Sequence, residues 1–252
     1  MLPLPSVNWP ALAASAEEPT LHLTDSDLDH NKDVRLEMFV NPAHADKLLD
    51  GTGHTLSELF KLANEHKTLP RFELPVRIRA KPHMQKTAVR SANVIGKIEG
   101  SDPKLKSDFV VLSAHIDHLG IGKPMNGDPI FHGAIDNASG VAALLDIAAA
   151  LKLEGVRPKR SVLFVFFTGE EPGYTKLGSW YFTARPTVSL KSIVANLNVD
   201  SIHAFAPLQS VVALGLDESD LGDAARRAAS SQGLLIDPER ELFSNGFLRS
   251  DE

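Results

Sequence analysis

The chain has 252 residues, a length that suits one large domain or one domain with part of another. Its 26 basic and 32 acidic residues give a net charge of −6, and no stripe of Lys and Arg is present, so no nucleic-acid partner is expected. The absence of cysteine excludes disulfide scaffolds, thiolate metal sites, iron–sulfur clusters and thiol nucleophiles.

The first part of the chain does not resemble a complete domain. Residues 1–44 are rich in Pro, Asp and His, and only Val34–Val40 alternates as a strand does. A single strand cannot bury a core, so we expect an arm or a domain remnant here, followed by a catalytic domain over residues 45–252. No membrane span is expected, because the longest apolar stretch, Val141–Leu153, is short and interrupted by charges.

The remaining elements alternate between helix and strand. Apolar spacing predicts a helix over Thr55–His66, with Thr55 and Glu58 forming a capping-box pattern. Alternating or apolar runs predict strands at 73–79, 92–98, 109–114, 161–168, 193–199 and 210–214, and helical patterns lie at 138–153, 175–184 and 218–232. This order predicts an α/β fold, a three-layer αβα sandwich with a mixed, mostly parallel central sheet.

Polar residues gather where these strands end, which is where open α/β sheets place their sites. They are His115 and Asp117 after one strand, Asp136 before a helix, Glu170 and Glu171 after the next strand, and Asp200 after a third. One histidine with several carboxylates and no cysteine is a hard ligand set that suits zinc, manganese or cobalt.

Each of these groups has a plainer interpretation when it is taken alone. Asp136 could cap the helix that it precedes, Asp117 could orient a surface histidine, and adjacent glutamates usually lie on a solvated face. Their joint occurrence at consecutive strand ends favours a catalytic site.

The motifs HxD, GxxDNxSG, GEE and NxD occur in this order, and together they resemble the zinc-dependent aminopeptidases of metallopeptidase family 28, clan MH. The resemblance covers about residues 92–251. It includes Leu177-Gly178-Ser179 and Arg249-Ser250-Asp251, which look like the family's LGS and RSD segments. It implies the phosphorylase/hydrolase-like zinc exopeptidase fold. Residues 1–44 would then be the remnant of an inserted protease-associated domain.

The resemblance also implies a role for each polar residue, in a centre with one or two zinc ions. His115, Asp136 and Asp200 would bind the first ion, Asp136 and Glu171 the second, Glu170 would be the general base toward activated water, and Asp117 would hold the imidazole of His115.

The sequence departs from the family near its end. The family's last metal-ligating histidine lies in a segment beyond RSD, and that segment does not occur here, so we expect a chain truncated at both ends. Of the nearby histidines, His118 and His132 are expected to be loop residues or outer contacts rather than replacement ligands, and His203 lies outside the motif. A missing final strand would expose a sheet edge, which a second copy of the chain could cover.

The expected function is hydrolysis of N-terminal peptide bonds, with a peptide or aminoacyl compound as substrate. Two alternatives stay open: a single-zinc glutaminyl cyclase-like or carboxypeptidase activity, and an inactive metal-binding or interaction module. The family resemblance suggests a secreted or periplasmic protein, although the first 14 residues show no secretory signal peptide.

Overall fold

The computed structural model describes residues 9–15, 20–28, 38–81, 83, 85–171, 176–203 and 205–237. The chain divides into two compact units, Met1–Pro19 with His30–Val89, and Thr20–Asp29 with Arg90–Glu252. The boundary predicted between residues 44 and 45 falls inside the first unit. The interpretation of residues 1–44 as the remnant of an inserted domain stays a prediction.

The first unit contains short helices: α1 (Trp9–Ser15), a 3-10 turn (Pro42–His44), α2 (Asp46–Leu49) and α3 (Leu56–Asn64). Helix α3 confirms the predicted helix, and the Thr55 side chain accepts a hydrogen bond from the N–H of Glu58 at 3.2 Å. The side chain of Glu58 turns instead to His54.

Two strand predictions in this unit have different outcomes. The strand predicted at 73–79 is wrong, because this segment is irregular and its Leu74 and Ile78 are exposed. Pro75 removes a ladder donor there, and no described strand pairs with it. Most of the strand predicted at Val34–Val40 lies outside the described residues, and its last three residues are irregular.

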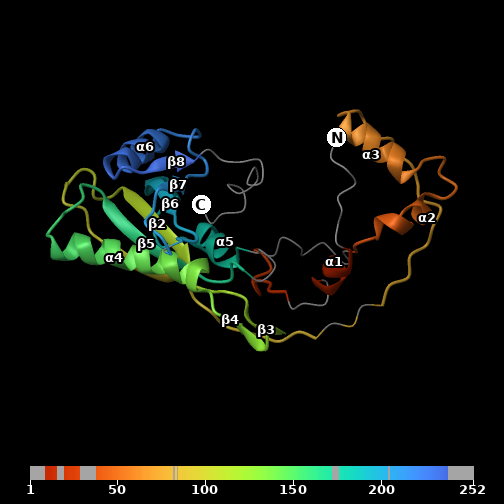
Figure 1. Cartoon of the computed structure of the whole chain (residues 1–252), viewed down its shortest axis with the longest axis horizontal. Helices are drawn as coiled ribbons and strands as arrows, with labels where there is room; N and C mark the ends of the chain where they lie inside the picture. The colour runs from red at the N-terminus through yellow and green to blue at the C-terminus, as the bar shows by residue number, and fades with distance from the viewer. Residues whose placement is uncertain are drawn as a thin grey trace. The chain divides into compact units, whose positions relative to one another are not determined.

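The second unit is built on a four-stranded sheet (Figure 1). Its strands are β1 (Val94–Ile98), β2 (Phe109–His115), β5 (Ser161–Phe167) and β6 (Ile193–Asn198), in the spatial order β1-β5-β2-β6. Strands β5, β2 and β6 are parallel, and β1 is antiparallel to β5. The mixed, mostly parallel sheet is therefore confirmed.

Alternate residues of β5 supply the cores on the two faces of the sheet. Leu163, Val165 and Phe167 pack with Phe182 of helix α5 (Leu177–Ala184). The intervening residues Val162, Phe164 and Phe166 pack with Leu144 of helix α4 (Gly140–Leu153). Because β5 is buried on both sides, its sequence is continuously apolar. The two helices and the sheet form the predicted three layers.

Two smaller sheets complete the described part of this unit. Strands β3 (Gly120–Met125) and β4 (Asp128–Phe131) form a hairpin, and β7 (Ser210–Val212) pairs with β8 (Leu235–Asp237) beside helix α6 (Leu221–Ser231). The hairpin was not predicted because it is almost wholly exposed and has no buried face to impose an apolar alternation. Its turn at Asn126-Gly127 has φ values of 52° and 89°, which suit Asn and Gly.

Helix α4 lies in the longest apolar segment of the chain. By length and composition the 20 residues Ala134–Leu153 could cross a membrane. They contain Val141–Leu153, the apolar stretch that by itself is too short to do so. In the fold they are a kinked turn, Ala134–Ser139, followed by α4, which packs on the sheet through Leu144. Helix α4 therefore forms one helical layer of the fold, and the turn that precedes it carries Asp136.

Candidate metal centre

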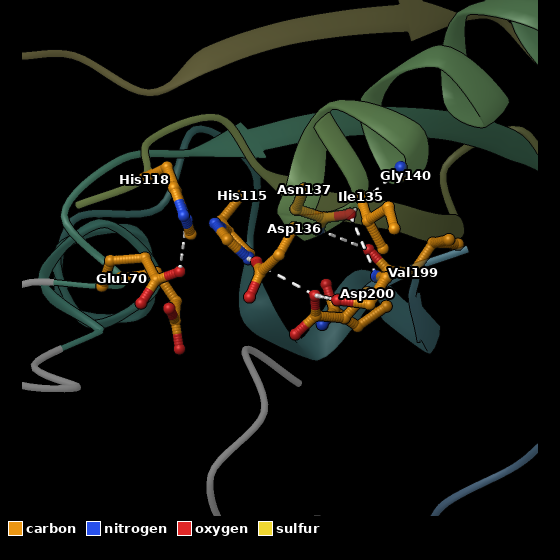
Figure 2. A network of polar contacts seen from close by, with 12 residues as sticks. His115, His118, Ile135, Asp136, Asn137, Gly140, Glu170, Val199 and Asp200 are labelled. Atoms are coloured by element: carbon orange, nitrogen blue, oxygen red, sulfur yellow. Dashed lines mark hydrogen bonds and ion pairs between the residues drawn. The ribbon is translucent and has the colours of Figure 1, made fainter. Parts of the chain in front are cut away.

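The site lies where the parallel strands end. His115 is the last residue of β2, Glu170 and Glu171 follow β5, and Asp200 follows β6. Asp136 reaches the same edge from the turn before α4. Figure 2 shows His115, Asp136 and Asp200 facing one another, with His118 and Glu170 beside them. The predicted site residues therefore come together.

His115 is held in one orientation at the centre of this group. Its side chain is 1% exposed, and Nδ1 lies 3.0 Å from the main-chain oxygen of Asp117. A carbonyl oxygen can only accept, so Nδ1 carries a proton and Nε2 faces the carboxylates. Nε2 lies 3.0 Å from Oδ1 of Asp136 and 3.4 Å from Oδ1 of Asp200. Ligands of a tetrahedral zinc ion lie about 3.4 Å apart, so these three residues fit a metal ion.

The carboxylates perturb one another and the histidine. Burial alone would lower the pKa of His115, but the hydrogen bond and charge of Asp200, followed by the charge of Glu170, raise it to about 9. The hydrogen bond from His115 lowers the pKa of Asp200 against the opposing effect of burial. Burial, followed by the charge of Asp136, raises the pKa of Glu171. So much negative charge in one place favours a bound cation.

One oxygen of Asp136 gives independent support for a metal. Its Oδ1 is buried and has no hydrogen-bond partner among the described residues, although Nε2 of His115 forms an ion pair with it at 3.0 Å. An orphaned, buried carboxylate oxygen costs free energy, and a metal ion would satisfy it. Three sets of residues each offer ligand atoms within 4.8 Å of one another: His115/Asp136/Asp200, His115/Glu170/Glu171 and His118/Asp136/Glu171. Asp136 belongs to two of them, as a bridging ligand would.

The structure gives the Asp117 side chain a different contact from the one predicted. The imidazole of His115 is held by the main-chain carbonyl of Asp117 rather than by its carboxylate. The carboxylate instead accepts the N–H groups of Glu170 and Glu171, each at 3.2 Å. The reason is the direction of the chain after β2, which aims the side chain at the loop that follows β5. Asp117 thus positions both glutamates.

Asn137 is a positioning residue that the sequence analysis did not single out. Its side chain is 2% exposed, donates to the carbonyl of Val199 at 2.9 Å, and accepts the N–H groups of Gly140 and Ser201 at 3.0 and 3.2 Å. These bonds tie the turn before α4 to the end of β6, so that Asp136 and Asp200 stay together. Its place in the GxxDNxSG motif was the available signal.

The nearby histidines have distinct surroundings. Nδ1 of His118 lies 2.8 Å from Oε1 of Glu171, within the site. His132 pairs with Asp128 of the hairpin and is 68% exposed. His203 is exposed in the segment after β6.

Only one of the two smaller motifs lies within the described residues. The Leu177-Gly178-Ser179 segment begins helix α5, as expected, whereas Arg249-Ser250-Asp251 lies outside the described residues.

Comparisons with known proteins point to a peptidase family. The family model described as Peptidase family M28 matches residues 93–252. A vacuolar membrane protease of Yarrowia lipolytica is 26% identical over 158 residues, which are 63% of this chain and 14% of that protein. Carboxypeptidase Q of Xenopus laevis is 29% identical over 118 residues, or 47% of this chain and 22% of that protein. The chain thus spans less than a quarter of either relative's length.

Solved structures are similar at a lower level. A leucine aminopeptidase precursor from Bacteroides thetaiotaomicron aligns over 63% of this chain and 62% of that chain, with a TM-score of 0.46 and 20% identity.

Proposed function

This chain belongs to peptidase family M28, whose model matches more than half of it, and on that premise we propose that it removes N-terminal residues from peptides with the help of bound zinc. The observation that carries the proposal is the set formed by His115, Asp136 and Asp200, with the orphaned Oδ1 of Asp136 at its centre. The donors are one imidazole and carboxylate oxygens, which zinc binds in hydrolytic sites.

Glu170 is the proposed general base. Its carboxylate is buried, and it shares a set of potential ligand atoms with His115 and Glu171. Zinc, when bound, supplies Lewis acidity, which polarises the scissile carbonyl and makes water more acidic. Glu170 takes a proton from the attacking water while the oxygen of that water bonds to the carbonyl carbon of the substrate. It then gives that proton to the departing amine as the C–N bond breaks.

The charge around the site favours a substrate with a free amine. The described segments that build the site, 115–118, 133–140, 168–171 and 199–203, contain acidic residues and histidines but no Lys or Arg. A carboxypeptidase needs a cation for the terminal carboxylate of its substrate, whereas these carboxylates attract a protonated α-amine. The curated relative named carboxypeptidase Q makes this distinction worth a direct test.

The experiment compares Glu170→Gln with the unchanged protein. We expect the variant to retain zinc and to lose hydrolysis of leucine anilide by at least about 100-fold, the lower end of the usual contribution of general acid–base catalysis. Glu154→Gln, at the exposed end of α4, is the matched control and should behave like the unchanged protein. Wild-type turnover in Glu170→Gln would show that the base is misassigned.

Substrate variants test the rest of the proposal. N-acetylation of leucine anilide should abolish turnover, because it removes the charged amine. Preference for a peptide with a blocked N-terminus and a free C-terminus would establish carboxypeptidase activity instead. Cyclisation of an N-terminal glutamine, without anilide hydrolysis, would establish the cyclase alternative. Zinc binding with no turnover of any of these substrates would leave a metal-binding module.

Among the described strands, β6 lies at an edge of the sheet, and this position bears on a protein partner. Within the described strands β6 pairs only with β2, and its Val194 and Leu197 are exposed. We propose that a second copy covers this edge, because exposed ladder groups and apolar side chains favour pairing. Sedimentation velocity at rising concentration tests it, and a monomer throughout would contradict it.

A further inference from the structure

Asn93 joins the end of strand β5 to the beginning of helix α5. Its side-chain N–H donates to the carbonyl of Gly178 at 2.8 Å, and its side-chain oxygen accepts the N–H of Thr168 at 3.2 Å. Thr168 directly follows β5, and Gly178 lies in the first turn of α5. The glutamate segment, residues 169–171, lies between these two attachment points and carries Glu170 and Glu171.

The pairing of the sheet explains why a side chain is needed at the end of β5. Strand β1 runs antiparallel to β5 with Val94 opposite Phe166, so a longer β1 would bring main-chain groups opposite Thr168. Because β1 begins at Val94, the ladder ends before it reaches Thr168. The amide of Asn93, the residue just before β1, supplies the acceptor that a longer ladder would have supplied.

The first turn of α5 lies directly against this strand end. A Cβ at Gly178 would be 2.3 Å from the main-chain oxygen of Thr168 and 2.5 Å from Oδ1 of Asn93, so only glycine fits there without displacing main-chain atoms. The N–H of Leu177 also bonds to the carbonyl of Gly169 at 2.9 Å, where Gly169 turns the chain out of β5 with φ of 69°. The amide of Asn93 therefore completes a compact group of bonds at the base of the glutamate segment.

The glutamate segment has a second support in Asp117. The N–H groups of Glu170 and Glu171 each donate to its carboxylate at 3.2 Å. The whole segment is buried, and both glutamates offer carboxylate oxygens in one set of potential ligand atoms with His115. Asp117 thus holds the main chain of the segment directly, whereas Asn93 holds the strand end from which the segment starts.

We propose that Asn93 is a positioning residue for Glu170, and that its two hydrogen bonds set where the carboxylate of Glu170 lies relative to His115. This inference rests on the proposed function, in which Glu170 is the general base. A base acts only from within hydrogen-bond reach of the water that it deprotonates, and a displacement of about 1 Å can cost about 100-fold in rate. Loss of the Asn93 amide should therefore lower kcat and leave KM nearly unchanged.

The competing role for Asn93 is to stabilise the fold without a particular effect on Glu170. The two roles separate in a double-mutant cycle of Asn93→Ala and Glu170→Gln. If the effect of Asn93→Ala passes through the base, it should change the residual turnover of Glu170→Gln by less than about 2-fold, because residues that act as a unit are not additive. A role in stability alone would lower turnover by the same factor in both backgrounds.

The experiment measures kcat and KM for leucine anilide, with every sample equilibrated in the same zinc buffer and its folding checked by circular dichroism. We expect Asn93→Ala to lower kcat by about 10-fold to 100-fold with little change in KM. Asn93→Asp keeps the acceptor for Thr168 but loses the donor to Gly178, so it should lower kcat in the same way, and it serves in the cycle if Asn93→Ala does not fold. The matched control is Lys97→Ala, at an exposed position of the same strand β1, which should change neither constant.

Amide hydrogen exchange gives a second measurement that does not depend on turnover. It is read residue by residue by NMR on the zinc-free protein. In Asn93→Ala the amides of Thr168, Glu170 and Glu171 should exchange at least about 5-fold faster, as the loss of one net hydrogen bond implies. In Lys97→Ala the same amides should exchange as in the unchanged protein.

Unchanged kcat in Asn93→Ala, or an equal loss of turnover in both backgrounds, would overturn the inference and leave the proposed function intact. Unchanged turnover in Glu170→Gln would overturn the assigned base and this inference with it. No turnover of leucine anilide by the unchanged protein would overturn the proposed function. Amide exchange would then decide the positioning role, and unchanged rates in Asn93→Ala would overturn it.

Discussion

Removing the Asn137 side chain tests how the site is held together. Asn137→Ala deletes three hydrogen bonds of 2.9, 3.0 and 3.2 Å from a side chain that is 2% exposed. At a net value of about 1 kcal/mol for each bond, the free energy of unfolding should fall by about 3 kcal/mol. The carbonyl of Val199 and the N–H of Gly140 would be left without this partner. The free energy of unfolding should therefore fall by no less than this amount.

The measurement is urea unfolding of the zinc-free protein, followed by tryptophan fluorescence. The chain has two tryptophans, and Trp180 belongs to the unit that holds the site, where its Nε1 donates to the carbonyl of Leu28. A Trp9→Phe background therefore confines the signal to that unit. With a slope of about 2 kcal/mol per molar urea, the midpoint should fall by about 1.5 M while the slope stays constant.

The matched control is Asn126→Gly in the hairpin turn. Asn126 is exposed with φ of 52°, a conformation that glycine adopts without strain, so stability should change by less than about 1 kcal/mol. A loss below about 1 kcal/mol in Asn137→Ala, equal to that of the control, would refute the view that this side chain clamps the turn to β6.

Two further predictions concern the same region. Gly140→Ala should destabilise the zinc-free protein in the same urea assay, because its Cβ would lie 2.3 Å from Oδ1 of Asn137 and 2.6 Å from the carbonyl of Val199; an unchanged midpoint would contradict this. Zinc binding at pH 7–8 should release a proton from His115, whose pKa is raised to about 9 in the metal-free protein, and this release should disappear above pH 9. Calorimetry in buffers of different ionisation enthalpy measures the release, and a heat independent of buffer would contradict the prediction.

The sequence predicted best the elements whose burial leaves a pattern. Strand β5 is apolar throughout because it is covered on both faces, and helix α3 begins at Leu56 because the side chain of Thr55 caps it. The hairpin β3–β4 and the short strand β8 left no such pattern, since their residues are mostly exposed or only partly buried. The irregular segment at 73–79 shows the reverse error, in which β-forming residues have no partner among the described strands.

The sequence by itself predicted that His115 and the carboxylates that follow β5 and β6 lie together at one edge of the sheet. Parallel strands end at one edge of a sheet, so polar residues after β2, β5 and β6 had to meet there. The tertiary structure alone decided what Asp117 and His118 contact. Side-chain direction follows a fixed period within a strand, but beyond its end the direction depends on loop dihedrals and on neighbours such as Gly133. That is why the carboxylate of Asp117 lies against the glutamate loop and why His118 lies beside Glu171.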